Sequence, residues 1–155
     1  MKSTALPLAP PKVQTPVRQA FCELKQAAHN WLEQLAELLE GDDISAGAIQ
    51  DAGEDEAIRL ELTLQSDTML AIASLVLDAR PCAEPDLTEF VMKFHVRRMV
   101  GPLVWIPLSL PHALSTVAQT LKGGKSPSLV AAQLIEQLES VPQTEYLLFF
   151  EDLAA

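Results

Sequence analysis

The longest regular pattern in the chain is an apolar stripe between Thr15 and Glu40. Thr15 is a good helix N-cap, Pro16 suits the first helical turn, and Gly41 can close a helix in a left-handed conformation. The pattern predicts a long amphipathic helix over residues 15–40, which must bury one face. The apolar residues recur at alternating steps of four and three, the spacing of a single helical face: Val17, Phe21, Leu24, Ala28, Trp31, Leu35 and Leu38.

The apolar face of this helix has two alternative destinations. It either packs against the rest of the same domain or receives a helix from another protein or a second copy of the chain. Ala28 allows a close approach and Trp31 supplies a large anchor in both cases. Under the second alternative, the candidate partner-binding residues are Phe21, Leu24, Trp31, Leu35 and Leu38.

A second informative stretch lies in the middle of the chain. Asp86 and Glu89 have the spacing of a capping box, and Gly101 followed by Pro102 can end a helix. These signals predict a helix over residues 86–100. The alternative is a strand, because one face of a strand over the same residues would also be apolar: Phe90, Met92, Phe94 and Val96.

Shorter patterns predict the remaining elements. Alternation of apolar and polar residues predicts a strand over 57–64, and the mixture of acid, Gly and Ala in 41–56 predicts a solvated loop. Residues 69–79 suit a helix by their Ala, Met and Leu content, with a strand hairpinned to the preceding one as the alternative. The rest of the chain is expected to form a strand over 103–106, helices beginning at Pro111 and Pro127, and a strand over 145–150.

This order of elements predicts a single α/β domain over residues 15–155, preceded by a flexible Pro-rich tail over residues 1–14. Two-helix crossovers between successive strands favour a small parallel sheet of three strands, covered by about five helices. If residues 69–79 form a strand, the sheet has four strands and the fold becomes α+β with an antiparallel hairpin. The acidic loop at 41–56 would lie on the surface of the domain.

Composition narrows the classes of function. With 11 Lys and Arg against 21 Asp and Glu, the net charge is −10, which argues against binding nucleic acid or an anionic membrane and favours a basic partner. The amino terminus lacks the continuous apolar segment of a signal peptide, and no apolar run is long enough to span a bilayer, so we expect a cytoplasmic protein. Cys22 and Cys82 have neither disulfide-framework nor zinc spacing.

Few residues point to chemistry. The chain contains none of the common nucleophile, metal or phosphate-binding motifs, so no catalytic residue, metal ligand or cofactor is predicted. The adjacent Arg97 and Arg98 are a candidate anion-binding pair, unless they only complement the carboxyl end of the predicted helix. If the sheet is parallel, a ligand site would lie beyond the carboxyl ends of its strands, where His112 would meet carboxylates from other loops.

These observations favour a small acidic adaptor that binds another protein through a helix face and an acidic surface. A chaperone, an immunity-type inhibitor and an assembly factor all fit that description. One alternative is a small ligand-binding domain or enzyme with its site at the strand ends. Another is a structural subunit that associates with copies of itself as a homodimer or larger oligomer.

Overall fold

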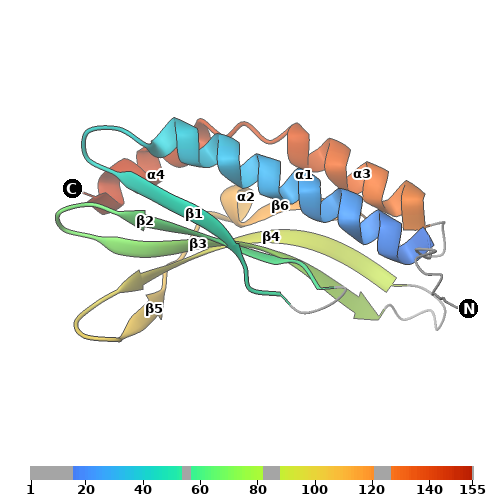
Figure 1. Ribbon diagram of the computed structural model, residues 1–155, viewed down its shortest axis with the longest axis horizontal. Helices are drawn as coiled ribbons and strands as arrows, with labels where there is room; N and C mark the ends of the chain where they lie inside the picture. Colours follow the sequence, from blue (N-terminus) through green and yellow to red (C-terminus); the bar gives the residue numbers. More distant parts are fainter. Residues whose placement is uncertain (1–15, 54–56, 82–87, 121–126, 155) are drawn as a thin grey trace, which may run out of the picture.

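In the computed structural model, residues 16–53, 57–81, 88–120 and 127–154 can be described (Figure 1). They form an α+β fold in which a six-stranded antiparallel sheet is combined with four helices. The predicted tail at 1–14 lies outside the described residues. The elements in chain order are α1 (Pro16–Leu39), β1 (Ser45–Asp51), β2 (Arg59–Gln65), β3 (Leu70–Pro81), β4 (Thr88–Met99), β5 (Trp105–Pro107), α2 (His112–Ser115), β6 (Thr116–Thr120), α3 (Pro127–Glu139) and α4 (Glu145–Ala154).

The long first helix, the strand near residue 60 and the helix that begins at Pro127 are confirmed as α1, β2 and α3. The alternation of β2 is reflected in its burial, because Leu60, Leu62 and Leu64 are all buried while Arg59 and Gln65 are exposed. Its apolar side chains therefore face the helices, as period-two patterning requires.

The central helix predicted over residues 86–100 is wrong, because these residues form strand β4. Eleven consecutive residue pairs join β4 to β3 in antiparallel register, from Ala71 opposite Arg98 to Pro81 opposite Thr88. The strand alternative for residues 69–79 is correct for the same reason, since they belong to β3. A ladder of this length satisfies the backbone of both segments at once, which outweighs the local capping signals around Asp86.

The parallel arrangement is also wrong, since every strand pairing is antiparallel. The acidic segment expected as a loop over 41–56 contains strand β1, and the helix expected from Pro111 is only the short α2, followed by strand β6. The strand predicted over 103–106 appears two residues later as β5. The strand predicted over 145–150 is instead the start of helix α4.

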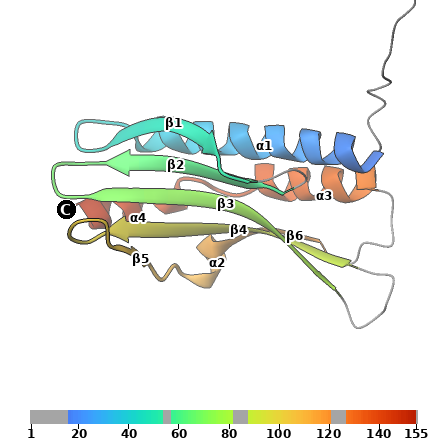
Figure 2. The same cartoon turned by 60° about the horizontal axis from the view of Figure 1, so that its bottom comes forward.

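Helices α1, α3 and α4 form one layer over one face of the sheet, whereas the short α2 lies near the β4 edge (Figures 1 and 2). Helix α1 packs on α3, on α4 and on strands β1 and β2. Four aromatic rings meet where this layer covers β4: Phe94 lies 5.6 Å from Trp31, 4.9 Å from Tyr146 and 6.4 Å from Phe150, measured between ring centroids. These edge-to-face contacts explain why α4 is helical, because its aromatic residues reach the core on one helical face.

The sheet has two different edges. Its strands run in the order β1-β2-β3-β4-β5, and β6 also pairs with β4. One edge is therefore β1, which lies beside α1 in Figure 2. At the other edge β5 and β6 share the outer side of β4, with α2 between them in the chain (Figure 2).

Candidate functional site

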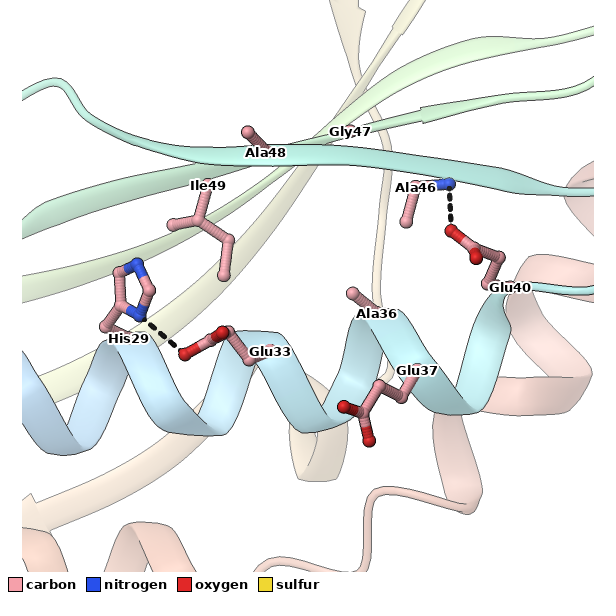
Figure 3. Close-up of a pocket in the computed structure, with 9 residues that line it drawn as sticks. All are labelled: His29, Glu33, Ala36, Glu37, Glu40, Ala46, Gly47, Ala48 and Ile49. Atoms are coloured by element: carbon pink, nitrogen blue, oxygen red, sulfur yellow. Dashed lines mark hydrogen bonds and ion pairs between the residues drawn. The ribbon is translucent and has the colours of Figure 1, made fainter.

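The strongest candidate site is a groove between helix α1 and edge strand β1. It encloses about 400 Å³ and is lined by one stretch of α1 and one stretch of β1 (Figure 3). Ala36, Ala46 and Ile49 point into the space between helix and strand and give it a small apolar floor. The other lining residues are His29, Glu33, Glu37, Glu40, Gly47 and Ala48.

Acidic side chains border the groove along the helix. Glu33, Glu37 and Glu40 recur at steps of four and three, so they follow one side of α1 beside the strand. The Glu33 carboxylate lies 2.9 Å from His29 Nδ1, and Glu40 accepts a hydrogen bond of 3.3 Å from the amide of Ala46. Glu40 therefore ties the carboxyl end of α1 to the beginning of β1, whereas the groove as a whole keeps a negative charge.

The far end of β1 is anchored by a second ion pair. Lys25 Nζ lies 2.9 Å from Asp51 Oδ2, and the Asp51 carboxylate also accepts the amide of Gly53 at 3.1 Å. The hydrogen bond from Lys25 holds the pKa of Asp51 below its usual value, and the Gly53 amide adds to this effect while burial opposes it. The strand is thus fastened to α1 at both ends of the groove.

Some backbone groups of β1 point away from β2, toward the outer edge of the sheet. The amide of Ala52 donates to the carbonyl of Arg59 on β2. Gln50, two residues before Ala52, lies opposite Glu61 of β2 and has the same orientation. Because amide direction alternates along an antiparallel strand, Ile49 and Asp51 turn their amides away from β2. No other strand of the described residues pairs with this edge.

Strand β1 lacks two of the features that protect a sheet edge but has another, a bulge. Its sequence, SAGAIQD, contains no proline or lysine, the residues that commonly block strand addition. A register shift between Ala46 and Ile49 interrupts the ladder to β2, so the regular part of the edge runs from Ile49 to Asp51.

The structure places the five predicted partner-binding residues in different environments. Leu24, Trp31 and Leu35 are buried in the core, and Phe21 is half-buried against it. Leu38 is partly exposed. The apolar stripe of α1 is thus used inside the domain, and the side of α1 that borders the groove is the acidic one.

The two arginines do not form a joint anion site. Neighbouring residues of a strand point to opposite faces of the sheet, so β4 separates Arg97 from Arg98. Arg97 donates to Glu61 at 3.0 Å, whereas Arg98 donates to the backbone carbonyl of Thr68 at 3.3 Å. The prediction assumed a helix, in which the two side chains could have converged on one ligand.

The face of the sheet opposite the helices carries a polar cluster. The Glu61 carboxylate forms ion pairs with Arg97 and, at 3.4 Å, with Arg59 Nε. The hydroxyl of the buried Ser74 lies 3.5 Å from the same carboxylate oxygen. His95 is the cross-strand neighbour of Ser74 and is exposed. Ser74 directs its hydroxyl toward the Glu61 carboxylate.

The site expected beyond the strand ends loses its basis, because an antiparallel sheet has no common carboxyl edge. Gln65 and Asp67 line a separate polar groove with residues of the loop after α1 and with Ala154, but His112 is not among its lining residues. His112 instead begins α2 and is exposed.

Cys22 is exposed, and Cys82 lies outside the described residues. Within the described ranges no group of three or more His, Cys, Asp or Glu side chains is placed to hold a metal ion. None of the described helices is both long enough and apolar enough to cross a membrane.

Comparison with known proteins found no matching family model, no similar curated protein and no similar solved structure. The groove between α1 and β1 must therefore be interpreted from its own geometry. Sequence reasoning identified the acidity of this region but missed the strand, because Ala and Gly give β1 a weak strand signal.

Proposed function

We propose that this chain is a protein-binding adaptor that holds a short, extended, basic segment of a partner along strand β1. The observation that carries the proposal is the position of a strand edge, unpaired among the described residues, beside Glu33 and Glu37 of α1 and Glu40 just after it. This function is of the chaperone or assembly-factor kind, since the bound segment would be kept in an extended form.

The backbone supplies affinity in such a complex. The outward amides of Ile49 and Asp51 and the neighbouring carbonyls match the hydrogen-bonding groups of an extended peptide. Alternate side chains of an added strand point to the same face as Ile49, toward α1 (Figure 3). The basic side chains of the added strand occupy these alternate positions beside the glutamates, and its apolar side chains lie on the opposite face.

Charge supplies selectivity. Glu33, Glu37 and Glu40 lie within reach of lysine or arginine side chains on the added strand, and the chain's net charge of −10 favours a basic partner at longer range. Surface ion pairs are each worth about 0.2–1 kcal/mol, so three of them change affinity by roughly tenfold.

The test uses fluorescent peptides of seven residues, the length of β1, in an anisotropy titration. A peptide that alternates Lys and Val should bind, and one that alternates Glu and Val should not. Methylating alternate amide nitrogens on one edge of the Lys-Val peptide should abolish binding, because it removes the donors of the ladder. Equal binding of the methylated peptide would refute strand addition.

A matched pair of variants separates the groove from general acidity. The triple variant Glu33→Gln, Glu37→Gln and Glu40→Gln should weaken binding of the Lys-Val peptide about tenfold. The control neutralises three exposed carboxylates on α3 and α4, through Glu136→Gln, Glu139→Gln and Glu151→Gln. It has the same net charge, so an equal loss in both proteins would show that the groove has no special role.

A further inference from the structure

The edge of the sheet opposite β1 is free of charge. Residues 99–121 contain no Asp, Glu, Lys or Arg, although charged residues make up 21% of the chain. The described part of this stretch, 99–120, forms β5, α2 and β6 along the outer side of β4. Charged side chains are one of several features that protect sheet edges, and this edge has instead prolines and a strand of only three residues.

The same edge exposes a cluster of large apolar side chains. The hairpin between β4 and β5 carries four of them: Val100, Leu103, Val104 and Ile106, with Leu103 exposed to 86%. Figure 1 shows this hairpin extending away from the helical layer. Exposed apolar groups gathered in this way mark an interaction surface rather than the ordinary scatter of surface residues.

Leu103, at the tip of the hairpin, has an exposed side chain and an unfavourable backbone conformation. Leu103 has a φ of 60°, in the left-handed region that residues with a Cβ avoid by about 1 kcal/mol or more. Asn would be accommodated better at this position and would not be apolar. A strained leucine at the most exposed point of the loop is explained if its side chain packs against another surface.

Proline 107 determines how that surface is contacted. The amide of Val100 donates to the carbonyl of Val104, and the amide of Leu108 donates to the carbonyl of Val96. Residues 104, 106 and 108 therefore direct their backbone groups toward β4, and Pro107 directs its nitrogen toward the outer edge. Because proline lacks an amide hydrogen, the outer edge of β5 cannot extend the ladder. Contacts at this edge must therefore be made by side chains, in contrast to β1.

From these observations we infer that the β5–α2 edge is the contact surface between two copies of this chain. The argument for this occupant is charge. A basic partner is drawn to the acidic groove at β1, whereas an uncharged surface is complementary to another uncharged surface, and a second copy supplies one. Pairing through this edge also keeps the two acidic grooves at opposite ends of the assembly, which limits repulsion between two chains of net charge −10.

The edge also contains the two complementary parts that a two-fold interface needs. A groove of about 320 Å³ lies beside β5, and apolar residues such as Val76, Leu108 and Leu110 line it together with Arg59, His95 and Arg97. Leu103 lies in the turn before β5, and Leu108 follows the strand. A two-fold axis near Trp105 would place each Leu103 against the groove of the other copy, so that the contact is made twice.

The length of the edge suits this role. One side of a standard interface uses about 20–30 residues and about 800 Å², roughly a tenth of a small protein's surface. Part of the stretch 99–119 is exposed, whereas Val117 and Ala118 are buried in the core, so the contact would use the exposed part alone. The accessible surface of the chain is 8997 Å², so an interface of this kind would cover a similar fraction of it.

The test is the molar mass of the purified full chain, measured by light scattering after size exclusion and by sedimentation over a range of concentrations. The parent should be a dimer at micromolar concentration. Leu103→Asp and Leu103→Asn should both be monomeric and folded by circular dichroism, because the side chain is exposed and both new residues tolerate a positive φ. The matched control is Leu148→Asp on α4, which is 68% exposed and lies outside this edge, and it should remain a dimer.

A parent that stays monomeric at about a hundred micromolar would overturn the inference, as would a Leu103→Asp variant that dimerises as well as Leu148→Asp. The result is independent of the proposed function, because a monomeric Leu103 variant should still bind the Lys-Val peptide at β1. Raising the salt concentration should preserve the dimer while it weakens peptide binding, since only the second contact depends on charge.

Discussion

Tyr146 couples the stability of the fold to alkaline pH. It is the single tyrosine of the chain, it is fully buried, and its hydroxyl donates a hydrogen bond of 2.8 Å to the carbonyl of Leu114. Burial raises the pKa of Tyr146 well above its usual value of 10.0, and the neighbouring charge of Glu145 adds to the effect. In the unfolded chain the same hydroxyl ionises near 10.0.

The direction of the pH effect follows from proton binding. Above about pH 10 the unfolded chain loses the tyrosine proton while the folded chain retains it, so the unfolded state is favoured increasingly as pH rises. The contribution of the raised pKa is fully present below 10.0 and is lost as pH approaches the folded pKa. The slope reaches about 1.4 kcal/mol per pH unit, so stability should fall by about 1 kcal/mol between pH 10 and pH 11.

The variant Tyr146→Phe isolates this contribution. At neutral pH it removes the donor to Leu114 and leaves a carbonyl without its partner, which should cost about 1–2 kcal/mol and lower Tm by about 3–6 °C. Because Phe does not ionise, the variant should lack the tyrosine part of the alkaline slope. The stability gap between parent and variant should therefore narrow by about 1 kcal/mol between pH 10 and pH 11.

The assay is urea unfolding followed by circular dichroism at a series of pH values, with tyrosinate absorbance recorded on the folded parent. Lysines titrate in the same range but are common to both proteins, so they cancel in the difference. A gap that does not change with pH would refute the reasoning. So would tyrosinate absorbance that rises near pH 10 while the protein is still folded.

Two further substitutions test the packing of α1 and of the open sheet face. Ala28 is fully buried on α1, so Ala28→Leu should lower the free energy of unfolding by about 1–3 kcal/mol in urea titrations, whereas Glu23→Leu on the exposed side should change it by less than about 0.5 kcal/mol. Arg97 pairs with Glu61 and lies 5.6 Å from the ring of Trp105, so Arg97→Ala should cost about 0.5–1.5 kcal/mol. Arg97→Lys should recover only part of that loss, and full recovery by lysine would show that the planar guanidinium is unimportant.

Sequence patterns predicted the elements whose stability is local. Helix α1 has an uninterrupted stripe at helical spacing and suitable residues at both ends, and β2 alternates without exception. In β2 a single period explains all the apolar positions. In α1 the predicted stripe supplies Leu24, Trp31 and Leu35 to the core, whereas Leu38 is exposed and the buried Leu32 and Leu39 lie outside the stripe.

The patterns failed where a long-range contact decided the outcome. In β4, Phe90 and Phe94 fit both a helical and a strand period, and the choice is made by pairing with β3 along the whole strand. In α4 the run Tyr146–Phe150 has strong strand propensity, yet it is helical because Tyr146 and Phe150 both reach the ring of Phe94. Neither contact can be read from neighbouring residues in the sequence.

The candidate site was predicted only in its charge. Acidity after Glu33 was evident, but the groove depends on β1 lying beside α1, and β1 has a weak strand signal. The absence of charge over residues 99–121 was equally visible in the sequence. Its meaning emerges only when those residues are placed together along one edge of the sheet.

The two sheet edges differ in their ability to pair with a further strand, and this difference limits how many copies of the chain could join through their sheets. A subunit that can join others at both edges builds an open-ended fibre. Here Pro107 prevents the β5 edge from extending a ladder, and the glutamates along the β1 groove repel a second copy of the same groove. If β1 binds a basic chain as proposed, we expect growth by adding strands to stop there, so that the edge stays open to its partner without the molecule polymerising on itself.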